Sequence, residues 1–103
     1  TIGQLLMQRK SLSDIAKARG MTAETVMAHI EKLVEEESRV DMQYLKHEIP
    51  RAHFLKIEKA ITELSKEGKV LLLTPIKNKV GPNVSFLHIR LARALLGKAP
   101  KDE

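Results

Sequence analysis

The stretch Ser11–Leu33, SLSDIAKARGMTAETVMAHIEKL, decides which fold the sequence predicts. Ser11 is suited to cap a helix, and Gly20 is suited to end that helix, because glycine enters the left-handed conformation without a Cβ clash. Thr22 is placed to cap a second helix. That helix repeats apolar residues at helical spacing, namely Val26, Ile30 and Leu33. The stretch therefore predicts two helices joined by a tight turn.

The spacing of Ala16, Gly20 and Val26 is typical of a helix-turn-helix, with a small residue at the helix crossing and a glycine in the turn. In DNA-binding proteins of this kind the second helix lies in the major groove, and its first residues contact base edges. Thr22 and Thr25 occupy those front positions here, and no front residue is basic. The second helix ends in three acidic residues, Glu35, Glu36 and Glu37. A helix-turn-helix that serves only for packing is therefore the alternative interpretation.

The length and composition of the chain exclude several classes of protein. The 103 residues suffice for one domain, or for two very small ones that share a core. Without cysteines there are no disulfides or thiolate metal sites, and a reducing cytoplasm is compatible. No apolar run approaches the roughly 18–20 residues of a membrane span, and no signal peptide is present. We therefore expect a cytoplasmic protein with no membrane partner, and the start at Thr1 suggests a piece of a longer chain.

Charge is distributed unevenly along the sequence. Residues 1–50 hold 7 Lys+Arg against 8 Asp+Glu, which gives −1, and residues 51–103 hold 11 against 5, which gives +6. A basic half suggests an acidic partner, most simply the phosphates of a nucleic acid. The alternative is that the basic residues only keep a small domain in solution.

Helical signals continue through the whole chain and predict an all-α fold of about six helices. Two helix-turn-helix-like units, residues 1–40 and 50–97, would share one core within a domain of residues 1–97, followed by a disordered tail, 98–103. The predicted helices include 2–8, 23–37, 42–46, 50–66, 75–80 and 86–96. Thr74 is predicted to cap the helix 75–80. The apolar run 70–73 is predicted to be a buried extended connector.

The second unit contains TPIKNKVGPNVSFLHIRLARALL, residues 74–96, which predicts a degenerate second helix-turn-helix. Arg90 and Arg93 are three residues apart on its last helix, so we expect them to share an open face. Lys77 and Lys79 precede its turn. Its positive charge makes this unit the better DNA binder of the two. The alternative is that these basic residues form an ordinary solvent-exposed face. The predicted nucleic-acid-binding residues are therefore Lys77, Lys79, Arg90, Arg93, Thr22 and Thr25.

Catalytic and cofactor motifs do not occur in the sequence. No glycine-rich loop with a following Gly-Lys-Ser/Thr is present to bind a nucleotide. The four histidines have no ligand-like spacing, and no nucleophile elbow surrounds a serine. We therefore expect no catalytic residue, no cofactor and no metal site in this fragment.

Three segments together resemble a known family: the stretch 11–33, the helix IEKAITEL and the second unit TPIKNKVGPNVSFLHIRLARALL. Over about residues 4–97 they resemble the helix-turn-helix domain at the extreme C-terminus of many bacterial RecQ-type ATP-dependent DNA helicases. The first motif also resembles LuxR-type response regulators, which share its SxxDIA…TV..H run. The second unit is not a LuxR feature, and it favours the RecQ resemblance.

The RecQ resemblance implies a parent helicase of DNA repair and recombination, in the bacterial cytoplasm and associated with the nucleoid. Its motor, zinc and winged-helix regions would precede Thr1. ATP and Mg²⁺, with Zn²⁺ as a further candidate, would be cofactors of that parent, and no such residue carries over to this chain. Two functions follow: an accessory DNA-binding module, or a protein-interaction or packing module that docks on the helicase motor. A DNA-binding fragment of a LuxR-like regulator is the third.

Overall fold

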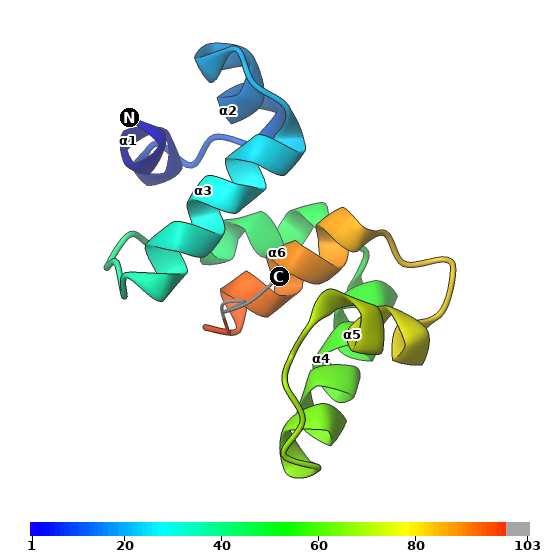
Figure 1. The fold of residues 1–103 in the computed structure, drawn as a ribbon. Coiled ribbons are helices and arrows are strands. Elements are labelled where there is room, and N and C mark those ends of the chain that lie inside the picture. Colours follow the sequence, from blue (N-terminus) through cyan, green and yellow to red (C-terminus); the bar gives the residue numbers. More distant parts are fainter. Residues whose placement is uncertain (99–103) are drawn as a thin grey trace.

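Six α-helices and one short 3₁₀ helix form the part of the chain that the computed structural model describes, residues 1–98 (Figure 1). In chain order they are α1 (Ile2–Met7), α2 (Leu12–Arg19), α3 (Ala23–Glu35), η1 (Gln43–Glu48), α4 (Arg51–Lys66), α5 (Leu73–Val80) and α6 (Phe86–Leu95). No strand occurs within these residues, so the predicted all-α fold is confirmed. The predicted disordered tail lies outside the described residues, except for Lys98.

The helix-turn-helix forms at α2 and α3, which pack against each other as the spacing predicted. The hydroxyl of Ser11 accepts a hydrogen bond from the backbone N–H of Asp14 at 3.0 Å and so caps α2. Gly20 ends α2 in the left-handed conformation, with φ at 63°. Ile15, Val26 and Ile30 are fully buried between the two helices and the rest of the core.

The last helix, α6, is the central helix of the fold. It packs against α3, α4, α5 and η1, and Figure 1 shows it between α3 and the α4–α5 pair. Ile89 on one side and Leu91 on another are both fully buried, because helices cover α6 from several directions. The buried apolar residues consequently form one cluster that extends from Ile2 to Leu95.

Two helices end earlier than the sequence predicts. The first ends at Met7 and the third at Glu35, and both are followed by a left-handed residue that is not glycine, Arg9 with φ at 58° and Glu37 with φ at 55°. After α3, the N–H of Ser38 donates a hydrogen bond to the carbonyl of Leu33 at 2.9 Å, which gives a carbonyl in the last turn of the helix a partner. The chain therefore turns within the acidic run that was predicted to be helical.

The middle of the chain also differs from the prediction. The predicted short helix is a 3₁₀ helix that begins at Gln43. The predicted buried connector is partly open, and the side chain of Val70 is 65% exposed. The fifth helix begins at Leu73, so Thr74 lies inside its first turn and does not cap it. Pro75 is also in that first turn, where its missing N–H leaves no helical hydrogen bond unmade.

Candidate nucleic-acid interface

The outward side of α3 carries a row of exposed residues that we call the outer stripe: Thr25, Ala28, His29 and Lys32. Their spacing of three and four residues places them on one face of the helix. Residues on the opposite face, including Val26 and Ile30, are fully buried. Because no other element of residues 1–98 covers the outer stripe, it is available to a ligand along about two turns of the helix.

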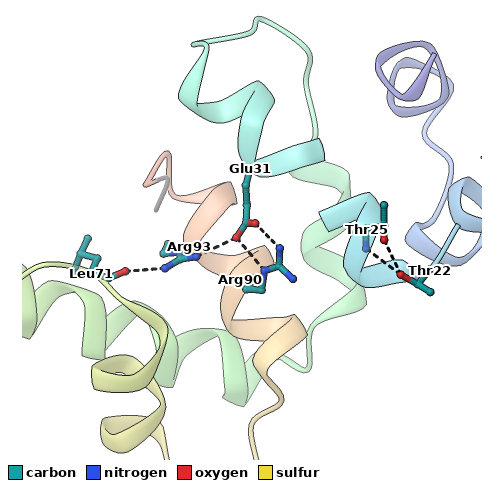
Figure 2. Close-up of polar contacts among 6 residues, drawn as sticks. All are labelled: Thr22, Thr25, Glu31, Leu71, Arg90 and Arg93. Atoms are coloured by element: carbon teal, nitrogen blue, oxygen red, sulfur yellow. Dashed lines mark hydrogen bonds and ion pairs between the residues drawn. The ribbon is translucent and has the colours of Figure 1, made fainter. Parts of the chain in front are cut away.

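Thr22 and Thr25 stand at the front of α3, as the sequence predicted, and both are exposed (Figure 2). The Thr22 hydroxyl caps the helix by accepting a hydrogen bond from the N–H of Thr25 at 3.2 Å. The hydroxyls of the two residues also lie 3.0 Å apart and share a hydrogen bond. Threonine can offer a base edge or a phosphate both a hydroxyl and a methyl group, so the pair suits a contact with DNA.

Positive charge lies on both sides of the tight turn. Lys17 and Arg19 are exposed in the last turn of α2, and Lys32 is exposed on the outer stripe. In a helix-turn-helix the first helix crosses the phosphate backbone, so cations at its end are placed for phosphates. Glu24 in the first turn of α3 opposes them. The interface is therefore weakly basic.

Arg90 and Arg93 do not share an open face, so that prediction is wrong. Arg93 is fully buried, and its guanidinium donates to the carboxylate of Glu31 at 3.0 Å and to the carbonyl of Leu71 at 2.8 Å (Figure 2). Arg90 donates to the same carboxylate at 3.1 and 2.5 Å. We call Glu31, Arg90 and Arg93 the arginine–glutamate cluster. It fastens the inner side of α3 to α6.

Helical spacing explains where the arginine–glutamate cluster lies. Arg93 follows the buried Ile89 by four residues, and Glu31 follows the buried Met27 by four, so each charge lies on a core-facing side. Glu31 was not among the site residues predicted from the sequence. Its spacing from Met27 was the available signal, but a charged residue is usually solvated.

A comparison with protein families agrees with the geometry of α2 and α3. The model of a family described as a helix-turn-helix domain matches residues 3–93. The chain belongs to this helix-turn-helix domain family. No curated protein and no solved structure matches the chain. Membership suggests DNA as the binding partner, and the match covers both of the units that the sequence predicts.

The two predicted lysines of this helix-turn-helix domain lie on α5, which packs against α4 and α6. The ammonium group of Lys77 donates to the carbonyls of Pro82, at 3.5 Å, and Val84, and so holds the loop that precedes α6. The ammonium group of Lys79 lies 3.1 Å from the carboxylate of Glu63. Both cations thus have partners within the domain, and their contact with DNA stays a prediction.

Behind the helix-turn-helix, Glu48 at the end of η1 connects the motif to the core. Its carboxylate accepts a hydrogen bond from the N–H of Leu12, the first residue of α2, at 3.1 Å. His88 on α6 lies close enough to interact with Glu48 and His53. Burial lowers the pKa of His88, the electrostatic interaction with His53 lowers it further, and Glu48 opposes both. Neutral His88 is therefore the form that the folded helix-turn-helix domain favours.

Within residues 1–98, no group of three or more histidine and carboxylate side chains is arranged to hold a metal ion. In the same part of the chain, no helix combines the length and the apolar character needed to cross a bilayer. The outer stripe of α3 is thus the candidate site that both the motif and the exposed residues support.

Proposed function

We propose that this helix-turn-helix domain is an accessory DNA-binding module at the C-terminus of an ATP-dependent RecQ-type helicase that acts in DNA repair and recombination. The resemblance over about residues 4–97 supports the helicase parent, and the family match over residues 3–93 supports DNA binding. ATP and Mg²⁺ would act in the motor of the parent protein. The domain itself would help the motor to hold its substrate.

The observation that carries DNA binding is the uncovered outer stripe of α3. The helix has 13 residues and so is about 20 Å long at roughly 1.5 Å per residue. A major groove about 12 Å wide admits such a helix. Thr22 and Thr25 would lie at the base edges, and Lys17 and Arg19 would meet the phosphates on which α2 lies.

The number of available cations sets the expected salt dependence. Each phosphate that is neutralised contributes about −0.9 to the slope of log affinity against log salt. If Lys17, Arg19 and Lys32 each meet one phosphate, the slope is about −2.7, and the affinity falls about 40-fold between roughly 50 and 200 mM salt. A steeper slope would require cations from another face of the domain.

Fluorescence anisotropy with a labelled duplex tests this interface. Thr25→Glu places a negative charge at the front of α3 and should weaken binding at least about tenfold at low salt, and Lys32→Glu should do the same. Lys56→Glu is the matched control, because it makes the same charge change as Lys32→Glu on the exposed side of α4. If the control loses as much affinity, or if the unaltered chain does not bind, the domain is not a DNA reader through α3. A protein-interaction or packing module of the same helicase is then the better function.

The helicase parent is tested by the coding sequence upstream of Thr1. We expect helicase motor motifs there, and a response-regulator receiver domain would instead favour the LuxR-like alternative. The purified chain by itself should neither hydrolyse ATP nor unwind DNA, since its sequence holds no phosphate-binding loop. DNA-stimulated ATP hydrolysis by the purified chain would contradict the assignment of catalysis to the motor.

A further inference from the structure

A groove lies between η1 and the first turns of α4, and it shares no residue with the helix-turn-helix motif. We call it the η1–α4 groove. Its volume is about 640 Å³, within the roughly 300–1,000 Å³ of typical ligand clefts. Both elements pack on α6, so their positions are fixed by the central helix.

One carboxylate, Glu58, and three basic side chains line the η1–α4 groove, the three being Lys46, His47 and Arg51. All three are exposed, and among residues 1–98 none of them forms an ion pair with a carboxylate. This differs from Lys79, Arg90 and Arg93, each of which forms an ion pair with a carboxylate of the fold. The groove therefore presents positive charge that the domain leaves for a partner.

Apart from Gln43, the rest of the groove wall is apolar. Leu55 is 51% exposed, and Pro50 is also exposed, so both offer apolar surface to the groove. Phe54 is only 5% exposed, and the ammonium group of Lys46 lies 4.5 Å from the centre of its ring. Because no aromatic face is open in this groove, nucleic acid bases would find nothing on which to stack. An aliphatic side chain, however, could cover Leu55 and Pro50.

We propose that the η1–α4 groove binds an acidic peptide segment of a partner protein, with an aliphatic side chain placed between its carboxylates. The carboxylates would pair with Lys46 and Arg51, and the aliphatic side chain would bury Leu55. Charge complementarity of this kind speeds association and selects the partner, while an apolar anchor supplies affinity. The inference does not rest on DNA binding by α3, so either can fail without the other.

The test uses the whole chain and a short synthetic peptide of aspartate and glutamate with a central leucine. Titration of the ¹⁵N-labelled chain should shift the amide signals of residues 46–55, and calorimetry should give the affinity. Lys46→Glu combined with Arg51→Glu should lower that affinity at least about tenfold, because two attractions become repulsions. Leu55→Ser should lower it about threefold or more, since an apolar contact of this size is lost.

The matched control is Lys56→Glu combined with Lys59→Glu, which makes the same change of net charge on α4 outside the groove. It should lower the affinity less than about threefold, through long-range attraction alone. A peptide with serine in place of leucine should bind more weakly to the unaltered chain and equally to Leu55→Ser. All the substituted residues are exposed, and circular dichroism confirms that each variant is folded.

Several results would overturn the proposal. The peptide could fail to shift residues 46–55 at low salt, or the control could lose as much affinity as the groove variant. A single-stranded oligonucleotide that displaces the peptide and shifts the same signals more strongly would make the groove a phosphate site. A dimer that forms with concentration and is lost in the groove variant would assign it to a second copy of the chain. If the groove variant does not fold, the signal map of the unaltered chain and Leu55→Ser decide.

Discussion

Replacing Glu31 with glutamine removes the negative charge that Arg90 and Arg93 share, while it keeps the size of the side chain. Hydrogen bonds of 3.1, 2.5 and 3.0 Å join the two guanidinium groups to this carboxylate. Removing one partner of a buried ion pair costs about 3–5 kcal/mol, because the remaining charge stays buried without compensation. Arg93 is fully buried, but the Arg90 side chain is 19% exposed and can recruit water. We therefore expect the lower end, about 3 kcal/mol.

A loss of that size is large for this domain. A domain of about 100 residues has a free energy of unfolding of about 5–15 kcal/mol, and its melting temperature falls about 4–8 °C for each kcal/mol lost. Glu31→Gln should therefore melt roughly 12–24 °C lower than the unaltered chain. Urea unfolding followed by circular dichroism measures the free energy, and an unchanged dependence on urea shows that the same surface is exposed.

Two further variants separate charge from packing. Glu35→Gln changes an exposed carboxylate at the end of the same helix and should alter stability by no more than about 0.5 kcal/mol. Replacing all three members of the arginine–glutamate cluster with apolar residues, Glu31→Met, Arg90→Met and Arg93→Leu, should restore most of the loss, because no buried charge remains. The reasoning is refuted if Glu31→Gln unfolds within about 1 kcal/mol of the unaltered chain, or if the triple variant is no more stable than Glu31→Gln.

Further predictions concern single residues. Folding lowers the pKa of His88, so the folded state favours its neutral form. The stability that this preference contributes is fully present above 6.5, the pKa of the unfolded state, and is lost as the pH falls through the lower pKa of the folded state. The melting temperature should therefore drop more between about pH 7 and 5 in the unaltered chain than in His88→Gln, and equal drops would contradict this. Gly20→Ala should lower the free energy of unfolding by about 1–2 kcal/mol through the positive φ at this position alone, since no atom lies within 4 Å of the added Cβ. An unchanged urea midpoint would contradict this and mean that the turn relaxes. Thr22→Ala should cost about 1 kcal/mol by removing the cap of α3, whereas Thr22→Ser should keep it, and the prediction fails if the two unfold alike.

The parts of the fold that the sequence predicted correctly depend on neighbouring residues. Ser11 and Thr22 cap the helices they were expected to cap, because a cap bonds an N–H only three residues away. Gly20 ends α2 for an equally local reason. The central position of α6 was not predictable in this way. It depends on which helices surround α6. Helical spacing alone predicts one buried side, so the other side of α6 was predicted to be exposed to solvent.

The candidate site was likewise predicted from the sequence only in part. Thr22 and Thr25 are exposed at the front of α3, as the motif indicated, and their contact with DNA stays a prediction. Arg93 looked exposed because charged residues usually are, and its pairing with Glu31 joins positions 62 residues apart. Changing both α6 arginines to glutamate would place three carboxylates together in the core, and we expect that variant to unfold. The η1–α4 groove was not foreseen, since it arises only where the chain turns at Pro50 between two helices.

The central position of α6 has a consequence for how the chain folds during synthesis. Arg93 leaves the ribosome 62 residues after Glu31, and synthesis proceeds at about 5–20 residues per second, so roughly 3–12 s separate the two. Throughout that interval α3 carries a carboxylate and an apolar face without the helix that covers them. The first unit therefore cannot complete its packing until the second unit is made, and a chain interrupted before α6 would expose Ile30 and Met27 to chaperones and proteases.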